Sequence, residues 1–189
     1  MQTVRRDHKS GSTEFASSTR DRGFTLVELL IVLAITGIIA AIAIPGLLRA
    51  RMTGNETSAI ASLRTASLSQ TAYGASCGKG GYAATLAILG TAPPGSTAAF
   101  ISEDLGHAAP VLKSGYTFVM GPGAGSVAGP TDCNTLATIS HWVMTGVPQA
   151  YGLTGTRTFA TGGGEIWQST TSTAPAEPFT ASATVSPIQ

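Results

Sequence analysis

A long apolar run near the start of the chain constrains its fold more than any other feature. Phe24 to Ile44 reads FTLVELLIVLAITGIIAAIAI, 21 residues with a single charged side chain, Glu28. A helix rises about 1.5 Å per residue, so the run spans about 31 Å, close to the thickness of the hydrocarbon core of a bilayer. The run therefore predicts a transmembrane helix.

The charges around the run bear on its orientation in a membrane. Arg20 and Arg22 precede it and Arg49 and Arg51 follow it, so the immediate flanks favour neither orientation. The sequence further upstream adds three more bases, Arg5, Arg6 and Lys9. Because cytoplasmic flanks carry an excess of Lys and Arg, these bases favour an N-terminus inside the cell and a C-terminal body outside it.

Three other interpretations of the run remain open. It could be a secretory signal peptide with Ala41-x-Ala43 as its cleavage site, a plain signal anchor, or a buried core helix. The apolar region of a signal peptide usually has about 7–15 residues, fewer than this run, and the length also disfavours a core helix. Neither the signal peptide nor the plain anchor accounts for Glu28.

Glu28 is the fifth residue of the run. A carboxylate in hydrocarbon costs about a few kcal/mol, and charges inside membranes are usually paired and functional. No base lies within helical reach on the apolar side, and Arg22 is outside the run. We expect the partner of Glu28 to be a cation created nearby or supplied by another chain.

The residues around Glu28 carry a family resemblance. The string Arg22-Gly23-Phe24-Thr25-Leu26-Val27-Glu28, followed by apolar residues up to Pro45, closely resembles the processing motif of type IV prepilins and type II secretion pseudopilins. In that family a membrane peptidase cuts after the Gly and methylates the new N-terminal residue. The resemblance implies cleavage between Gly23 and Phe24, N-methylation of Phe24, and a role in filament assembly for Glu28 and Thr25.

Charge pairing gives this implied role a physical basis. Cleavage creates an ammonium at Phe24, which the Glu28 carboxylate of a neighbouring subunit can pair with inside an apolar bundle. A correctly staggered subunit satisfies both charges, whereas a misplaced subunit leaves both unpaired. The pair is therefore expected to set the register of the polymer.

The resemblance, strong over residues 22–73 and faint afterwards, also implies a function. The expected protein is a precursor that spans the bacterial inner membrane once, with its C-terminal domain outside the cytoplasm, and then polymerises into a pilus. Its implied partners are membrane lipid before assembly, further subunits, the prepilin peptidase and methyltransferase, an inner-membrane platform protein and an assembly ATPase. A pseudopilin of a type II secretion system is the close alternative, and a membrane-anchored binding module that never polymerises is the third.

The sequence predicts an α+β fold of the pilin-like kind, with one long N-terminal helix, transmembrane in its first half, packed on a small antiparallel sheet. The expected parts are a cleaved leader (1–23), the transmembrane half of the helix (24–45), its amphipathic half (46–74), a globular connecting region with the sheet (75–170), and a flexible Ser/Thr/Pro-rich tail (171–189).

Several residues mark features of the long helix. Pro45 lacks an amide donor and is expected to kink it. Gly74 is expected to cap its C-terminal end. The face that packs on the sheet is expected to contain four apolar residues, Ile60, Leu63, Ala66 and Leu68.

Beyond the helix, residues 82–89 form a short helix candidate. Four strands are predicted, Tyr116–Met120, Thr138–Thr145, Arg157–Ala160 and Glu165–Gln168. Glycine-rich links at residues 121–125 and 162–164 separate them, and such short links favour an antiparallel meander.

The chain has two cysteines, Cys77 and Cys133, both after the apolar run. If this part is exported, a disulfide between them is expected. Closing so long a loop contributes about 4 kcal/mol in the chain-entropy description. Free structural thiols are the alternative.

No catalytic, metal or cofactor site stands out in the sequence. Cys77, Cys133, His107 and His141 lack the spacing of a zinc site. Three acidic residues are weak candidates for calcium, Glu103, Asp104 and Asp132. The net charge of +1 calls for no nucleic acid partner. We therefore expect neither an enzyme nor a bound cofactor.

Overall fold

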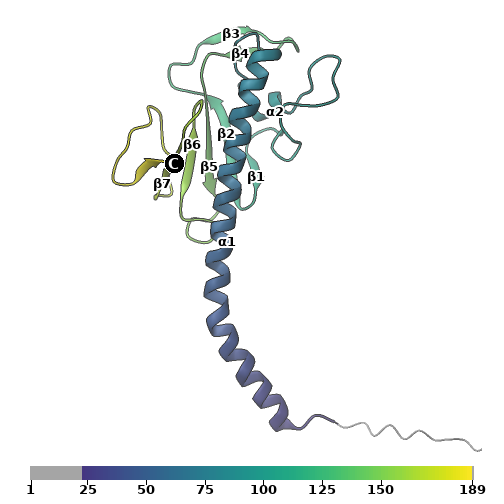
Figure 1. The fold of residues 1–189 in the computed structure, drawn as a ribbon, viewed down its shortest axis with the longest axis vertical. Coiled ribbons are helices and arrows are strands. Elements are labelled where there is room, and N and C mark those ends of the chain that lie inside the picture. The colour runs from purple at the N-terminus through teal and green to yellow at the C-terminus, as the bar shows by residue number, and fades with distance from the viewer. Residues whose placement is uncertain (1–22, 189) are drawn as a thin grey trace, which may run out of the picture. The chain divides into compact units, whose positions relative to one another are not determined.

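The computed structural model describes residues 23–188, and the expected leader lies outside them except for Gly23 (Figure 1). The elements are, in chain order, α1 (Leu26–Ser76), α2 (Leu86–Leu89), β1 (Val111–Lys113), β2 (Tyr116–Pro122), β3 (Ala128–Thr131), β4 (Ala137–Ile139), β5 (Trp142–Pro148), β6 (Thr158–Thr161), β7 (Ile166–Ser169) and β8 (Val185–Pro187). The chain divides into two compact units between Ile42 and Ala43.

The first unit is the N-terminal part of α1. The helix begins at Leu26, so it contains the expected transmembrane run except Phe24 and Thr25, and its large apolar side chains are exposed. The assigned helix continues through Pro45 into the second unit. The kink at Pro45 stays a prediction.

In the second unit, one face of α1 packs on the sheet. Its buried residues recur at intervals of three and four, the spacing of one helix face: Glu56, Ala59, Ser62, Leu63, Ala66, Ser69, Gln70 and Tyr73. The predicted burial of Leu63 and Ala66 is confirmed. The prediction for Leu68 is wrong, since this side chain is 73% exposed. Leu68 lies two residues beyond Ala66 and therefore about 200° around the helix from it, outside the buried face.

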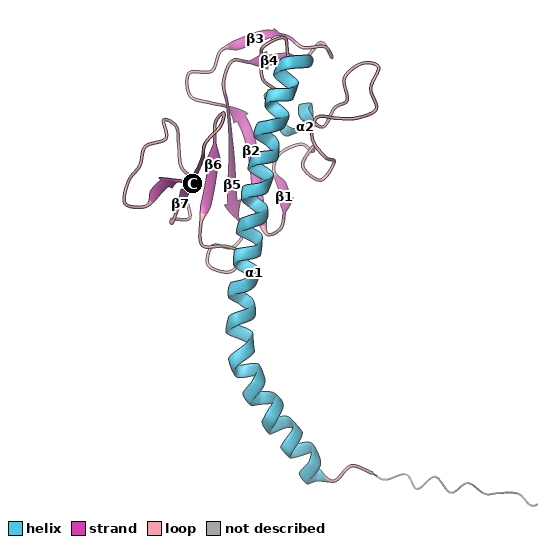
Figure 2. Ribbon diagram, viewed as in Figure 1, coloured by secondary structure: helices cyan, strands magenta, loops and turns pink. Residues whose placement is uncertain are grey.

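The strands form an antiparallel sheet in the order β1-β2-β5-β6-β7-β8, with β3 and β4 paired in a separate ribbon (Figure 2). Phe118 of β2 pairs with Gly146 of β5, which pairs in turn with Phe159 of β6. Phe118 and Phe159 are fully buried and belong to the core together with Leu63. The predicted α+β fold, one long helix on a small antiparallel sheet, is confirmed.

The end of α1 differs from the prediction. The helix runs to Ser76, so Gly74 lies inside it and the predicted C-cap is wrong. A Cβ at Gly74 would lie 3.3 Å from the Gly81 carbonyl oxygen, so glycine there allows the close approach of residues 81–82. Lys79 takes the left-handed conformation (φ 50°), and the Gly80 amide bonds to the Gly74 carbonyl at 2.9 Å. This bond, from residue i+6 back to residue i, gives a carbonyl in the last turn of the helix a partner.

The predicted helix over residues 82–89 is shorter than expected. Tyr82 instead exchanges two backbone hydrogen bonds with Ile139, of 2.8 and 2.9 Å. The side-chain amide of Gln70 binds both the carbonyl (2.7 Å) and the N–H (2.9 Å) of Ala83. These long-range bonds hold the segment extended, so α2 begins only after Thr85, which caps it.

The predicted strand Thr138–Thr145 is two strands. Residues up to Ile139 pair with β3, and residues from Trp142 onward pair with β2. Between them, the Ser140 amide bonds to the Val127 carbonyl and the His141 carbonyl accepts from Gly123. The chain passes from the ribbon to the main sheet at this point.

Three strands were not predicted: β1, β3 and β8. β8 lies within residues 171–189, for which the sequence predicts a flexible tail. It pairs with β7 through Val185 and Ser186 and forms an edge of the sheet. The sheet therefore extends beyond the predicted boundary at residue 170.

Candidate functional site

Gly23 and Phe24, the predicted cleavage site, lie in non-helical chain immediately before α1. The Phe24 side chain is 88% exposed, and no heavy atom lies within 4 Å of the position that a Cβ on Gly23 would take. None of the described residues therefore blocks the approach of an enzyme to the Gly23–Phe24 peptide bond. Cleavage and methylation themselves stay predictions.

Thr25 and Glu28 form a capping box at the start of α1. The Thr25 N–H and hydroxyl both donate to Glu28 Oε2, at 2.9 and 2.8 Å. The Glu28 N–H donates in return to Thr25 Oγ1 at 3.2 Å. This arrangement satisfies backbone donors that the first turn of a helix leaves free.

The capping box was missed in the sequence, although its signal is present. A Thr followed three residues later by Glu, just before an apolar run, is the pattern of such a box. An anion in the first turn also interacts favourably with the helix dipole. The structure thus brings together the two residues expected to act in assembly, and gives both of them a local role as well.

The N-terminal part of α1 exposes a large apolar surface. Phe24, Leu26 and the other large apolar side chains up to Leu48 are all at least half exposed. α1 is long and apolar enough to cross a membrane, and none of its most apolar stretch is buried, unlike a core helix. Soluble monomers rarely expose apolar patches above a few hundred Å², so this surface requires lipid or another chain.

Glu56 attaches α1 to the sheet of the second unit. Its Oε2 accepts from Arg157 Nε at 2.9 Å and Nη2 at 2.7 Å, and its Oε1 accepts from the Thr156 N–H at 2.8 Å. Arg157 Nη1 also donates to Gln168 Oε1 in β7 at 2.8 Å. Burial raises the pKa of Glu56, but the bonds from Thr156 and Arg157 outweigh it, so the net pKa is lowered.

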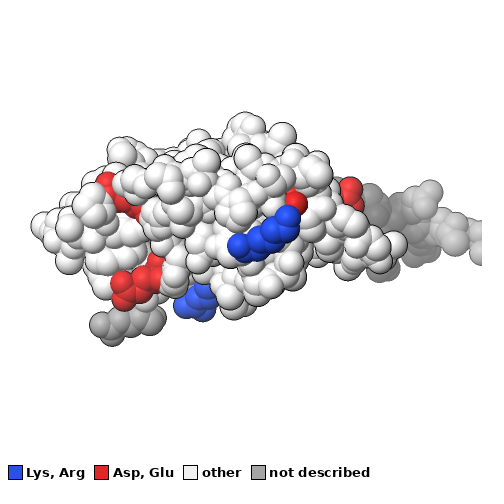
Figure 3. All heavy atoms as spheres, turned by 90° about the horizontal axis from the view of Figure 1, so that it is seen from above, with Lys and Arg blue, Asp and Glu red and all other residues white. Residues whose placement is uncertain are grey.

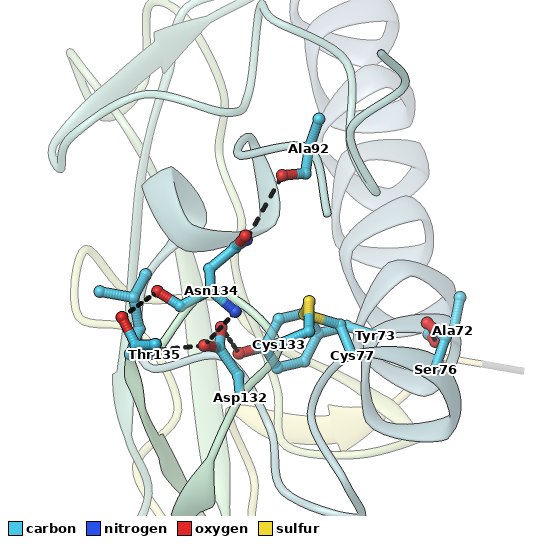
Figure 4. The surroundings of a disulfide bond; sticks show 10 residues. Ala72, Tyr73, Ser76, Cys77, Ala92, Asp132, Cys133, Asn134 and Thr135 are labelled. Carbon is cyan, nitrogen blue, oxygen red and sulfur yellow. Dashed lines mark hydrogen bonds between the residues drawn. A yellow bond between two sulfur atoms is a disulfide. The ribbon is translucent and has the colours of Figure 1, made fainter. Parts of the chain in front are cut away.

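The disulfide joins Cys77, just after α1, to Cys133 in the turn between β3 and β4, with the two Cα atoms 4.8 Å apart (Figure 4). Beside it the Tyr73 hydroxyl donates to Asp132 Oδ2 at 2.7 Å. Asp132 Oδ1 accepts from the amides of Asn134 and Leu136. Burial, followed by the bond to Asp132, raises the pKa of the Tyr73 phenol.

The C-terminal segment is fastened to the sheet at points before β8. Glu177 accepts from the Ala124 N–H at 2.7 Å and pairs with His141 Nε2 at 2.7 Å. The ring of Phe179 stacks on that of Trp167 in β7, with centroids 5.8 Å apart. No sequence signal identified these contacts, because they join segments distant in the chain.

The described residues include no group of three His, Cys, Asp or Glu side chains placed to hold a metal ion. Of the candidates, Asp104 pairs with Lys113 at 2.6 Å, and Asp132 and His141 have the partners given above. Figure 3 shows a face that is mostly uncharged and carries only a few acidic and basic side chains. That face offers no strongly charged patch.

Comparison with known proteins places the similarity at the N-terminal end. A protein-family profile described as "Prokaryotic N-terminal methylation motif" matches residues 18–44. This range contains Gly23, Phe24, Thr25 and Glu28, so it contains the capping box and the whole apolar run.

Two curated relatives match part of the chain. The type IV wide pilus major component PilA4 of Thermus thermophilus is 52% identical over 52 residues, 28% of this chain and 40% of the relative. The type IV major pilin protein PilA of Myxococcus xanthus is 43% identical over 54 residues, 29% of this chain and 24% of the relative. The similarity therefore spans less than half of either relative. No solved structure gives a significant match.

Proposed function

We propose that this chain, which is similar to type IV pilins over part of its length, is a structural subunit of a type IV pilus. In this proposal it is made as a membrane-inserted precursor, cut between Gly23 and Phe24, methylated on Phe24 and polymerised through α1. The relatives named above are major pilus components, which supports a pilus rather than a secretion pseudopilus.

The observation that carries the proposal is the combination at the start of α1. An exposed peptide bond, Gly23–Phe24, precedes a helix whose apolar surface is unburied and contains one carboxylate, Glu28. An apolar helix of this length suits a bilayer before assembly and a bundle of like helices after it. A plain membrane anchor has no need of a carboxylate in the first turn.

The geometry of the capping box suggests how Glu28 serves assembly. Both bonds from Thr25 reach Oε2, and Oε1 accepts no hydrogen bond from residues 23–188. Oε1 is therefore available to the ammonium that cleavage creates on Phe24 of a neighbouring subunit. Thr25 holds the carboxylate in place while the neighbour supplies the charge that a buried anion needs.

Processing and assembly of such a subunit require several partners. Other copies of the chain supply the filament, and a prepilin peptidase and methyltransferase processes the precursor. An inner-membrane platform protein and an assembly ATPase drive polymerisation. The C-terminal domain lies outside the cytoplasm before assembly, and the finished filament lies at the cell surface.

The first test is the intact mass and N-terminal sequence of the protein from its native membrane. We expect a chain that begins with N-methyl-Phe24. A chain beginning near Ile44 would indicate an ordinary signal peptide, and a chain that keeps Met1 would indicate an uncleaved anchor. Either result would contradict the proposal.

The second test is polymerisation of the Glu28→Ala variant. We expect this variant to insert in the membrane and to form no filaments, whereas Glu165→Ala, which removes an exposed carboxylate after β6, should assemble normally. Filaments from Glu28→Ala at the normal level would refute the role of Glu28. Surface fibres support a pilus, and a secretion defect without fibres would support a pseudopilus instead.

A further inference from the structure

Two arginines on α1 directly follow the apolar run and have no partner within the described chain. Arg49 and Arg51 are exposed, and neither forms an ion pair with any residue of 23–188. The residues three and four positions away on the helix, where a paired carboxylate would lie, include no acid. The nearest acidic residue along the chain, Glu56, is already bound by Arg157.

Arg49 and Arg51 extend from opposite sides of α1 at similar depth, an arrangement that we call a collar. They are two residues apart, so they lie about 3 Å apart along the axis and about 200° apart around it. Their two guanidinium groups therefore project from opposite sides of the helix at nearly the same depth. Helical side chains also lean toward the N-terminus, which directs both arginines back toward the apolar run.

The depth of the collar fits the surface of a bilayer. Arg49 lies about 7 Å along the axis beyond Ile44, and the headgroup layer on each side of the hydrocarbon core is about 5–8 Å thick. Long basic side chains near helix ends reach toward this layer. The side chains of Arg49 and Arg51 therefore reach the level of the lipid phosphates.

The part of the β5–β6 connection that first bonds to α1 carries no competing charge. The first hydrogen bond from α1 to the connection between β5 and β6 is from Asn55 Nδ2 to the Thr154 carbonyl, at 2.9 Å. Residues 150–156 of that connection read AYGLTGT and include no acidic or basic residue, and Arg157, which follows them, is paired with Glu56. Within residues 43–55 and 150–156, Arg49 and Arg51 are the only charged residues.

We propose that Arg49 and Arg51 form a collar that binds the phosphate groups of anionic phospholipids where α1 leaves the membrane. The inference rests on the membrane-inserted precursor of the proposed function. In that orientation both bases lie on the exported side, against the usual preference for Lys and Arg on the cytoplasmic side. Binding to anionic headgroups accounts for bases in this position.

A bilayer fits the collar better than a protein partner does. Lipid surrounds the helix and presents phosphates on every side, so opposed arginines at one depth are both satisfied. A single protein chain docking from one side would reach one of them. The collar therefore gives the unassembled subunit a fixed depth in the membrane from which it can be recruited.

The test is native mass spectrometry of the full chain in detergent micelles that contain equal amounts of phosphatidylglycerol and phosphatidylcholine. We expect the wild-type chain to retain phosphatidylglycerol preferentially. In Arg49→Gln/Arg51→Gln the preference should fall about fivefold for each arginine removed. Arg49→Lys/Arg51→Lys, which keeps both charges, should retain most of it.

A matched control removes two exposed bases that lie far from the collar. Arg64→Gln/Lys79→Gln alters exposed bases at least about 30 Å beyond Ile44 and should keep the wild-type preference. The bases of the leader are the same in every variant, so differences between variants report on the collar. Inorganic phosphate at millimolar concentration should not displace the lipid.

Several outcomes would overturn the collar. They are an unchanged preference in Arg49→Gln/Arg51→Gln, an equal loss in the control variant, and displacement by free phosphate. Because lipid retention requires no polymerisation, these outcomes are independent of the Glu28 test. A protein that retains the lipid but is never cut at Phe24 would keep the collar and lose the pilin function.

Discussion

Glu56 of α1 and Arg157, the residue before β6, form a bidentate ion pair with N–O distances of 2.9 and 2.7 Å. The pair joins residues 101 positions apart in the chain. Its carboxylate side chain is 6% exposed and its guanidinium side chain is 35% exposed. Because the same guanidinium also binds Gln168, one contact links the helix to two strands of the sheet.

We predict that Glu56→Gln destabilises the second unit by about 2 kcal/mol. The change leaves Arg157 without its anion, which costs about 3–5 kcal/mol for a fully buried pair and less here, because the guanidinium is partly solvated. The measurement is denaturant unfolding of the full chain in detergent, followed by tryptophan fluorescence. Glu103→Gln, at an exposed site, is the control and should leave the unfolding midpoint unchanged.

The pH dependence of this effect has a definite sign. The folded-state pKa of Glu56 is lowered from the usual 4.5, so its contribution is fully present above that value. It is lost as the pH falls through the lower folded-state pKa. The stability difference between wild type and Glu56→Gln should therefore be largest at pH 7 and shrink below pH 4.5. A difference that grows in acid would refute the assignment.

We predict that Tyr73 and Tyr116 ionise only as the fold is lost. Burial raises the pKa of both phenols, and each hydroxyl donates a hydrogen bond, to Asp132 and to the Arg157 carbonyl respectively. A raised pKa favours the folded state below the usual value near 10 and loses that contribution as the pH rises through the folded value.

The measurement for these tyrosines is tyrosinate absorbance during an alkaline titration, followed together with circular dichroism. Part of the absorbance increase should coincide with loss of ellipticity. Tyr73→Phe and Tyr116→Phe should each remove a share of that late increase. If the late increase is unchanged in both variants, other groups account for it.

We predict that removing the disulfide destabilises the second unit by about 4 kcal/mol, the value expected for a closed loop of this length. The double variant Cys77→Ser/Cys133→Ser, or the wild-type chain in a strong reductant, should unfold at a correspondingly lower denaturant concentration. The reductant should have no effect on the double variant, which controls for other actions of the reagent. Equal midpoints for wild type with and without reductant would show that the bond contributes nothing.

We predict that Phe179→Ala releases Trp167 to solvent. The stacked pair contributes about 0.5–1.5 kcal/mol beyond the area it buries. The emission of Trp167 should shift to longer wavelength, whereas Trp142, which is fully buried, should keep its emission. Trp167→Phe provides the control, because Phe179→Ala should then leave the spectrum unchanged.

The N-terminal half of the molecule could be predicted because its signals are local. The apolar run, the carboxylate at Glu28 and the Gly23–Phe24 motif lie within a few residues of one another. The capping box between Thr25 and Glu28 is also local, and its pattern can be read from the sequence. Predictions for Leu63 and Ala66 held because helical spacing defines the buried face.

The rest could not be predicted because distant residues decide it. Gln70 holds Ala83 extended, which shortens α2, and no pattern within residues 82–89 reveals this. β8 becomes a strand because β7 offers it an edge, although the composition of residues 171–189 resembles a flexible tail. The Glu56–Arg157 pair is likewise visible only once β6 is placed against α1.

The Cys77–Cys133 bond also determines whether a proteolytic cut releases a fragment of the chain. It closes a covalent ring that contains α2, β1, β2 and β3. A single backbone cut between Gly78 and Asp132 opens this ring but leaves β4 to β8 bonded through Cys133 to the residue that follows α1. A nicked subunit therefore keeps its outer strands attached to its membrane helix, so a cut in the longest connection, between α2 and β1, releases no fragment.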